Sequence, residues 1–332
     1  METDDLLCHI FEIKTEAQFT AVALEVFRFQ YEHMPVYRSF VDLMKVKVDE
    51  VNSLEKIPFL PIEFFKSHEI SYKPQTTNHK LFTSSGTTGE QLSKHYVTDI
   101  SVYKKSFRKG FEYFYGNIEE FCILALLPTY LERENSSLIF MTDDLIKQTK
   151  NPDSGFYQHN TSELIQKLNI LENKKQKTIL LGVTYALLDL IPHLSKLQTP
   201  NPKLVIMETG GMKGKRKEMV REELHKILCE GFGVQKIHSE YGMTELFSQA
   251  YSYGNGIFNC VPWMKILIRD VNDAKNFLPA EKTGGINVID LANIYSCSFI
   301  ATQDLGKFFP NNSFEVLGRF DNSDLRGCNL LV

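Results

Sequence analysis

The sequence has no excess of positive charge, no long apolar run and no basic leader. Its 37 Lys and Arg residues are outnumbered by 41 Asp and Glu residues, which argues against a surface built for nucleic acid. No apolar stretch approaches the roughly 20 residues that a membrane-spanning helix needs. Three of the first five residues are acidic and none is basic, whereas a secretory signal peptide begins with basic residues. We therefore expect neither a nucleic-acid partner, nor a membrane span, nor secretion.

The cysteines are scattered, and the chain lacks any Cys-x-x-Cys pair or a histidine at zinc-ligand spacing from a cysteine. This usage is typical of a reducing compartment, so we expect a cytoplasmic protein. Five of the six are expected to be small buried side chains, namely Cys8, Cys122, Cys229, Cys260 and Cys297. Cys328, close to the carboxyl end, differs because of the residues around it.

Continuous apolar runs alternate with amphipathic stretches through the middle of the chain. Strands buried on both faces are predicted at 121–127, 179–183 and 204–207, and helices at 103–114, 137–147, 161–171, 185–195 and 216–230. This alternation predicts β-α-β units and therefore an α/β core with parallel strands. A chain of 332 residues is long enough for one large core or two modest ones.

The two ends of the chain have different predicted secondary structure from the middle. Thr15-Glu16-Ala17-Gln18 has the pattern of a capping box that begins a helix, and a second helix is expected at 37–44. From Gly254 onward, short β-like pieces are separated by Asn-Asp and Gly-Gly turns. We divide the chain into a helical N-terminal segment packed on the core (1–75), an α/β core (76–253), a small β subdomain (254–317) and a hinge-like tail (318–332).

A loop of small residues follows an expected strand end at Leu81-Phe82. It reads Thr83-Ser84-Ser85-Gly86-Thr87-Thr88-Gly89. Backbone N–H groups and hydroxyls suit phosphate oxygens, and glycines let the backbone approach a ligand closely. Taken alone, the loop fits an ordinary Ser/Thr-rich turn equally well. A P-loop is not indicated, because its Gly-x-x-x-x-Gly-Lys-Ser/Thr spacing is absent here and in the second glycine loop at 208–215.

The segment His238-Ser239-Glu240-Tyr241-Gly242-Met243-Thr244-Glu245 is expected to follow a short strand that ends at Ile237. An aromatic ring, a tight turn, a hydroxyl and a carboxylate would then meet at one strand end, where ligands of open α/β sheets bind. A helix is expected from Leu246 onward. The alternative for the segment is an ordinary strand–helix turn capped by a threonine.

The order of these motifs is more specific than any one of them. With Asp304 in Thr302-Gln303-Asp304-Leu305-Gly306 and with Gly318-Arg319, they resemble the adenylate-forming superfamily, which includes acyl-CoA synthetases, peptide synthetase adenylation domains and firefly luciferase. The resemblance covers roughly residues 80 to 328. It implies an α/β large-domain fold with a helical N-terminal segment, parallel-rich sheets flanked by helices and a small C-terminal β subdomain, but no full C-terminal lid domain.

Within that superfamily the chain is most similar to the acyl-protein synthetases of bacterial bioluminescence systems. The similarity rests on residues 82–95, 127–133, 210–214, 238–245 and 318–328. It implies a ligase that uses ATP and Mg²⁺ to activate a fatty acid as acyl-AMP, carries the acyl group on its own cysteine and passes it to a protein such as an acyl reductase. Cys328 matches that cysteine, although a small residue in a frayed terminus is the alternative. It lies nine residues beyond Arg319, a separation that spans about 30 Å when extended.

The resemblance also implies roles for single residues. Tyr241 would stack on adenine, Asp304 would accept from the ribose hydroxyls, and Thr244 would contact the α-phosphate. Glu245 would ligate Mg²⁺. His238 would line the acyl pocket, with a satisfied core histidine as the equal alternative. The other implied nucleotide contacts are Ser84, Ser85, Gly86, Thr87, Thr88, Gly89, Gly210, Gly211, Met212 and Gly242.

Larger members of the superfamily add a lid that supplies a catalytic lysine, and this sequence ends about where the lid would begin. We expect Arg319 or Lys94 to provide that positive charge instead. Two other functions fit the same residues: a ligase that passes the acyl group to CoA or a carrier protein, like phenylacetate–CoA ligases, and a degenerate, non-catalytic binding protein.

Overall fold

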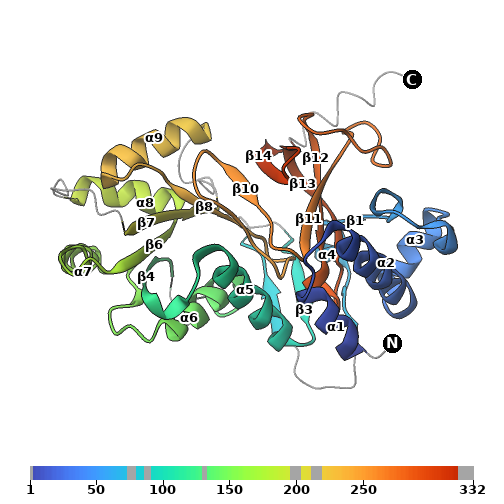
Figure 1. The fold of residues 1–332 in the computed structure, drawn as a ribbon, viewed down its shortest axis with the longest axis horizontal. Coiled ribbons are helices and arrows are strands. Elements are labelled where there is room, and N and C mark those ends of the chain that lie inside the picture. The colour runs from blue at the N-terminus through green and yellow to red at the C-terminus, as the bar shows by residue number, and fades with distance from the viewer. Residues whose placement is uncertain are drawn as a thin grey trace. The chain divides into compact units, whose positions relative to one another are not determined.

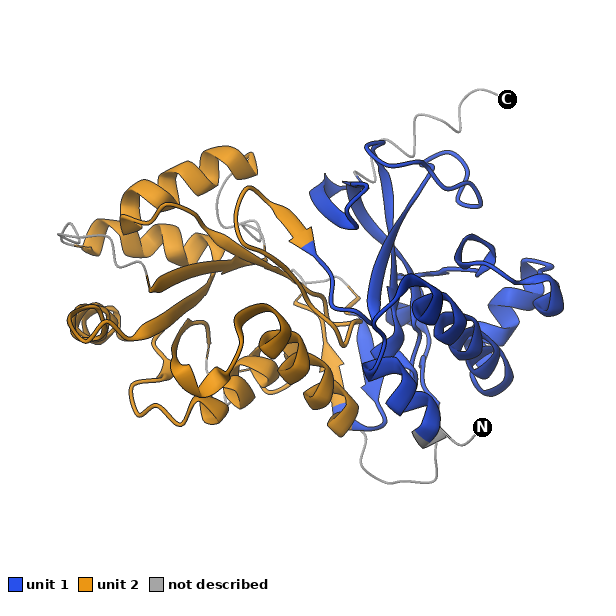
Figure 2. Ribbon diagram, viewed as in Figure 1, with its two compact units in different colours: residues 1–80, 93–99, 259–332 blue, residues 81–92, 100–258 orange. Residues whose placement is uncertain are grey.

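The structure is a computed structural model that describes residues 3–72, 80–85, 91–128, 133–194, 203–210 and 219–320. The chain forms two compact units (Figure 2). Unit 1 comprises residues 1–80, 93–99 and 259–332, and unit 2 comprises residues 81–92 and 100–258. In the described part of the chain, no helix combines the length and the apolar character that crossing a bilayer requires.

Unit 2 is built on a mostly parallel sheet. The strand order is β9-β8-β7-β6-β4-β5, in which only the β8–β9 pair is antiparallel. The strands of this sheet are β4 (Phe121–Leu126), β5 (Gly155–Phe156), β6 (Lys177–Val183), β7 (Leu204–Thr209), β8 (His238–Tyr241) and β9 (Ala250–Ser252). Three other short strands are β2 (Lys80–Thr83), β3 (Lys94–Val97) and β10 (Ile257–Asn259), of which β3 belongs to unit 1.

Helices cover both faces of this sheet, with α8 and α9 above it and α5 and α6 below it in the view of Figure 1. They are α5 (Ile100–Tyr115), α6 (Ser137–Thr149), α7 (Thr161–Asn173), α8 (Thr184–Leu190) and α9 (Arg221–Phe232), with short 3₁₀ turns at Ile118–Glu120 and Ile191–His193. Parallel strands connected through helices need apolar residues on both faces, which explains the continuous apolar runs in β4 and β6. The expected strands and most of the expected helices are confirmed.

Alternation along the strands divides the side chains between two layers. Leu124 on β4, Leu180 on β6 and Ile206 on β7 belong to the buried cluster shared with α7, α8 and α9. Their neighbours Ile123 and Met207 point to the opposite face, together with α5 and α6. Because successive strand residues face opposite sides, a shift of one residue would exchange the two layers.

Several local predictions were wrong. The strand expected to end at Ile237 instead begins at His238, and the helix expected from Leu246 onward is absent, since Ala250–Ser252 forms β9. The helix expected at 216–230 begins at Arg221 within the described residues and ends at Phe232. Cys8, expected to be buried, is exposed, and Cys229 and Cys260 are only partly buried.

Unit 1 contains an antiparallel sheet in the order β11-β12-β13-β14, with the short β1 pairing in parallel with β13. These strands are β1 (Leu60–Pro61), β11 (Met264–Arg269), β12 (Gly284–Asp290), β13 (Phe299–Phe308) and β14 (Ser313–Arg319). The short strands predicted after Gly254 are therefore confirmed.

The N-terminal helices pack within unit 1. They are α1 (Thr3–Phe11), α2 (Glu16–His33), α3 (Pro35–Leu43) and α4 (Phe64–Ser67), with 3₁₀ turns at Val48–Glu50, Leu54–Lys56 and Leu291–Asn293. The capping box at Thr15 and Gln18 is confirmed by both reciprocal hydrogen bonds. The buried Gln30 of α2 donates to the Ile294 carbonyl at 2.9 Å, which ties the helix to residues far along the chain.

The predicted mixed α/β fold with helix-flanked, parallel-rich sheets is confirmed. The four-part division at residues 75, 253 and 317 stays a prediction.

Candidate functional site

Two glycine-containing loops begin side by side in unit 2. The parallel strands β7 and β8 pair Thr209 with Glu240, and Gly210 and Tyr241 come directly after these two residues. Gly210 is exposed and has a φ of 62°, which is a conformation that glycine adopts without strain. The carboxyl edge of a parallel sheet is where open α/β folds bind ligands, so the structure brings two of the predicted motifs to such an edge.

Glu240 links these two strand ends. Its carboxylate is buried, and the hydroxyl of Thr209 donates to its Oε2 atom. A methyl group on Gly242 would lie 2.4 Å from the Glu240 Oε1 atom, so the glycine leaves room for the carboxylate. Burial, and to a smaller extent the charge of Glu208, raise the pKa of Glu240 to about 7 although the Thr209 hydrogen bond opposes the shift. Sequence reasoning missed this residue, although an acidic residue inside a buried strand is a usable signal.

A second missed residue, Glu208, supports the start of the Gly210 loop. The Arg221 Nη1 atom donates to Glu208 Oε1 at 2.7 Å, and the His225 Nε2 atom lies 3.5 Å from the same oxygen. The Thr184 hydroxyl donates to the Gly210 carbonyl at 2.6 Å and lies 3.2 Å from Glu208 Oε2. Burial alone would raise the pKa of Glu208, but the His225 imidazole and the Arg221 charge outweigh it, so the pKa is lowered.

The residues after β8 form a turn rather than the start of a helix. Tyr241 is buried, with its ring centroid 5.9 Å from that of Phe258, and Glu245 is also buried. Thr244 is half-buried in the turn between them. The alternative of a strand–helix turn capped by Thr244 is therefore wrong.

The Ser/Thr/Gly loop is described only at its start. Phe82 is buried against Tyr103 and Phe140, and the Thr83 N–H donates to the Asn135 carbonyl at 2.8 Å. Ser84 is half-buried and Ser85 is exposed. The remaining predicted contacts Gly86, Thr87, Thr88 and Gly89, like Gly211, Met212 and Cys328, lie outside the described residues.

His238 is a buried, hydrogen-bonded histidine. Its Nδ1 atom lies 3.1 Å from the Tyr115 hydroxyl of α5, and its ring also contacts Tyr253. Burial and the charge of Lys236 lower the pKa of His238 to about 4, so the imidazole is neutral at physiological pH. Its role in an acyl pocket stays a prediction.

In unit 1, two predicted site residues lie together. Asp304 on β13 and Arg319 on β14 are register partners, and the Arg319 Nε atom donates to Asp304 Oδ1 at 3.2 Å. Lys94 is the exposed first residue of β3. Within the described residues, no group of three or more His, Cys, Asp or Glu side chains is arranged to hold a metal ion.

Comparison with known proteins gives a family match and a fold match. The model of the family described as "Acyl-protein synthetase, LuxE" matches residues 5–332. A comparison with curated proteins found no significant match.

Among solved structures, ATP-bound MatB from Rhodopseudomonas palustris has a TM-score of 0.54 and 15% identity, covering 72% of this chain and 47% of its own. The chain thus spans about half the length of that protein. A 2-hydroxyisobutyryl-CoA ligase in complex with 2-HIB-AMP has a TM-score of 0.66 and 13% identity, covering 94% of this chain and 70% of its own. These likenesses show the fold of adenylate-forming enzymes.

Proposed function

Because the chain belongs to the LuxE acyl-protein synthetase family, we propose that it activates a fatty acid with ATP and carries the acyl group on Cys328 before passing it to a partner protein. The observation that carries this proposal is the pairing of β7 with β8, which brings the starts of the Gly210 loop and the Tyr241–Glu245 turn together. These are the two motifs to which the family resemblance assigns adenine and α-phosphate contacts.

In the first step, a carboxylate oxygen of the fatty acid attacks the α-phosphorus of ATP. A new phosphorus–oxygen bond forms as the bond to the β-phosphate breaks, and pyrophosphate leaves. Both reactants are anions, so the protein must neutralise charge and hold the attacking and leaving oxygens in line. Thr244 would contact the α-phosphate, and Arg319 or Lys94 would supply positive charge.

The remaining nucleotide contacts follow the family pattern. Tyr241 would stack on adenine beside Gly210 and Gly211, and Asp304 would accept hydrogen bonds from the ribose hydroxyls. The buried Glu245 would ligate Mg²⁺ together with phosphate oxygens, since this ion is usually held by one or two carboxylates plus phosphates. When bound, Mg²⁺ would neutralise phosphate charge.

In the second step, the Cys328 thiol releases its proton to water and its sulfur attacks the carbonyl carbon of acyl-AMP. A carbon–sulfur bond forms as the carbon–oxygen bond to the phosphate breaks, so AMP leaves and a thioester remains on the chain. Arg326, two residues before Cys328, would favour the thiolate. An acyl reductase is the acceptor that the family resemblance suggests.

The first step is tested by acid-dependent exchange of labelled pyrophosphate into ATP, measured with straight-chain acids of increasing length. The proposal predicts exchange that requires both a fatty acid and Mg²⁺. Absence of exchange with every acid would support the non-catalytic alternative. Exchange accompanied by label that appears only on added CoA would support the CoA-ligase alternative.

A further inference from the structure

A small cavity lies under the β8 end of the site, inside unit 2. It encloses about 20 Å³, and eight of its ten lining residues are aliphatic, aromatic or methionine. One of the two polar residues, Thr142, donates its hydroxyl to the Leu138 carbonyl and so is satisfied. The other is Glu240, which comes directly before Tyr241. The cavity therefore begins next to the predicted nucleotide motif and is otherwise apolar.

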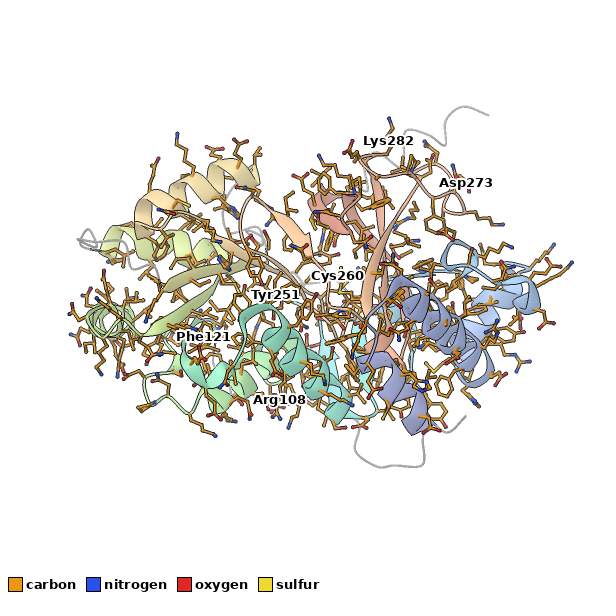
Figure 3. The ribbon with its side chains drawn as sticks, in the orientation of Figure 1. Arg108, Phe121, Tyr251, Cys260, Asp273 and Lys282 are labelled. Atoms are coloured by element: carbon orange, nitrogen blue, oxygen red, sulfur yellow. The ribbon has the colours of Figure 1, made fainter. Side chains whose placement is uncertain are left out.

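A larger surface groove lies on the far side of the same layer, along α5 and α6. It holds about 260 Å³ and is lined by residues that include Arg108, Asn117 and Gln148. Figure 3 shows Tyr251, a cavity residue, in the interior of unit 2 and Arg108 nearer its lower edge. The Arg108 guanidinium donates twice to the Asp144 carboxylate at 2.7 Å, which holds one side of the groove in place.

Cavity and groove share two wall residues. Phe111 of α5 and Leu145 of α6 line both, and each is buried. These two side chains therefore separate an interior space that reaches β8 from an opening at the surface. At the boundary between the two spaces, the lining residues that they share are these two apolar side chains.

The chemistry of the cavity suits a hydrocarbon chain. An apolar cavity offers a water molecule few hydrogen-bond partners, whereas methylene groups gain dispersion contacts and lose unfavourable hydration there. The present volume has room for about one water, so a longer ligand enters only if side chains turn. Met141 and Met207 line the cavity, and methionine adapts its shape more readily than a branched side chain.

We propose that the acyl chain of the substrate lies in this space between the sheet and helices α5 and α6, with its carboxylate end near Glu240 and its methyl end against Phe111 and Leu145. These two residues are then the determinants of chain length. The inference rests on the proposed fatty-acid activation, and it adds the location of the chain and the residues that limit it. His238 lies on the same face of β8 as Glu240 but does not line the cavity.

The test compares Leu145→Ala with Leu168→Ala. Both leucines are buried on helices that pack on the same sheet, but Leu168 belongs to the cluster on the opposite face. Pyrophosphate exchange is measured with saturated acids from six to eighteen carbons. Leu145→Ala should move the preferred acid to a chain longer by about two methylene groups, because the lost side chain leaves space of that order. Leu145→Phe should move it to shorter acids, and Leu168→Ala should leave the preferred length unchanged.

Binding of the fluorescent fatty acid cis-parinaric acid, measured without ATP, separates this inference from the proposed function. If wild-type protein shows no exchange with any acid, the adenylation proposal fails. The cavity assignment then stands if parinarate binding changes at least threefold in Leu145→Ala but not in Leu168→Ala, and it is overturned if the two variants behave alike. If exchange occurs and the chain-length profile is the same in all variants, the cavity assignment is wrong. Should Leu145→Ala not fold, Phe111→Leu replaces it at the same wall.

Discussion

Arg319 and Asp304 face each other across the β13–β14 pair, with the Arg319 Nε atom 3.2 Å from Asp304 Oδ1. The Asp304 side chain is 10% exposed, whereas the Arg319 side chain is 79% exposed. The family pattern gives the aspartate a ribose contact and we give the arginine a charge-stabilising role. One ion pair would therefore position both the aspartate and the arginine for these roles. Most of the Arg319 side chain stays accessible to solvent.

Replacing Arg319 should therefore lower activity far more than stability. Arg319→Ala is expected to reduce the rate of fatty-acid-dependent pyrophosphate exchange roughly 10²–10³-fold, the usual effect of losing one transition-state donor. The free energy of unfolding should change by less than about 1 kcal/mol, because the Arg319 side chain is mostly in solvent, where an ion pair contributes little. Urea unfolding monitored by circular dichroism measures the second quantity.

Lys307→Ala is the matched control, since Lys307 forms an ion pair with Glu315 across the same two strands at 3.0 Å. It should keep the wild-type exchange rate. Equal loss of exchange in both variants would show that the strand pair matters and that Arg319 has no special role.

Gly242→Ala should damage the turn after β8. The added methyl group would lie 2.4 Å from Glu240 Oε1, so the carboxylate or the turn must move. We expect a loss of roughly 1–3 kcal/mol in the free energy of unfolding, as for other overpacked sites, and a higher KM for ATP. Gly155→Ala is the control, because its nearest neighbour would be 3.5 Å away. A Gly242→Ala variant with wild-type stability and KM would contradict a close packing of Gly242 against the Glu240 carboxylate.

Glu240 should make stability depend on pH. Its pKa is raised to about 7 from an ordinary 4.5, so the folded chain retains a proton that the unfolded chain has released between these values. The contribution of the carboxyl group is fully present below about pH 4.5 and is lost as pH rises through 7. The stability of the wild type relative to Glu240→Gln should therefore fall over this range, by at most about 3 kcal/mol, and then level off.

Urea unfolding of both proteins at several pH values from 4.5 to 8.5 measures this difference. Glu222→Gln, at an exposed position on α9, should show no such trend. If the difference in the free energy of unfolding between the wild type and Glu240→Gln stays constant with pH, burial does not hold the carboxyl group neutral.

Arg221 should stabilise the fold by compensating a buried charge. Arg221→Ala would leave Glu208 buried without its guanidinium partner. We expect a loss of roughly 2–3 kcal/mol, below the value for a fully buried pair because the Arg221 side chain is 31% exposed. Lys47→Ala, which removes an exposed ion pair with Glu50, should cost less than about 1 kcal/mol. Similar thermal midpoints for the two variants would contradict this role of Arg221.

Much of the fold could be predicted from the sequence, because buried parallel strands leave a strong local signal. The apolar runs at β4 and β6 and the capping box at Thr15 are of this kind. The segment from His238 to Ala250 could not be predicted correctly, because its polar residues are buried by contacts from distant parts of unit 2. The Tyr115 hydroxyl and the Thr209 hydroxyl, for example, satisfy His238 and Glu240.

In the candidate site, too, some residues could be predicted from the sequence and others depend on contacts that form only on folding. Tyr241 and Asp304 were predicted as site residues from the order of the motifs and from the family that this order resembles, and their roles stay predictions. Glu208 could not be predicted, because its partners Arg221 and His225 come from the next helix and meet it only after folding. Pairing of Asp304 with Arg319 likewise depends on the register of two strands, which the sequence does not fix residue by residue.

Transfer of the acyl group to Cys328 is tested most directly with radiolabelled fatty acid, ATP and Mg²⁺, followed by denaturing gel electrophoresis. The wild-type chain should retain label that neutral hydroxylamine releases, as expected for a thioester. Cys328→Ala should lose that label while keeping pyrophosphate exchange, and Cys8→Ala, which removes an exposed cysteine, should retain it. Label that persists on the Cys328→Ala chain, or that never appears on the wild-type chain although exchange proceeds, would contradict acyl transfer to Cys328.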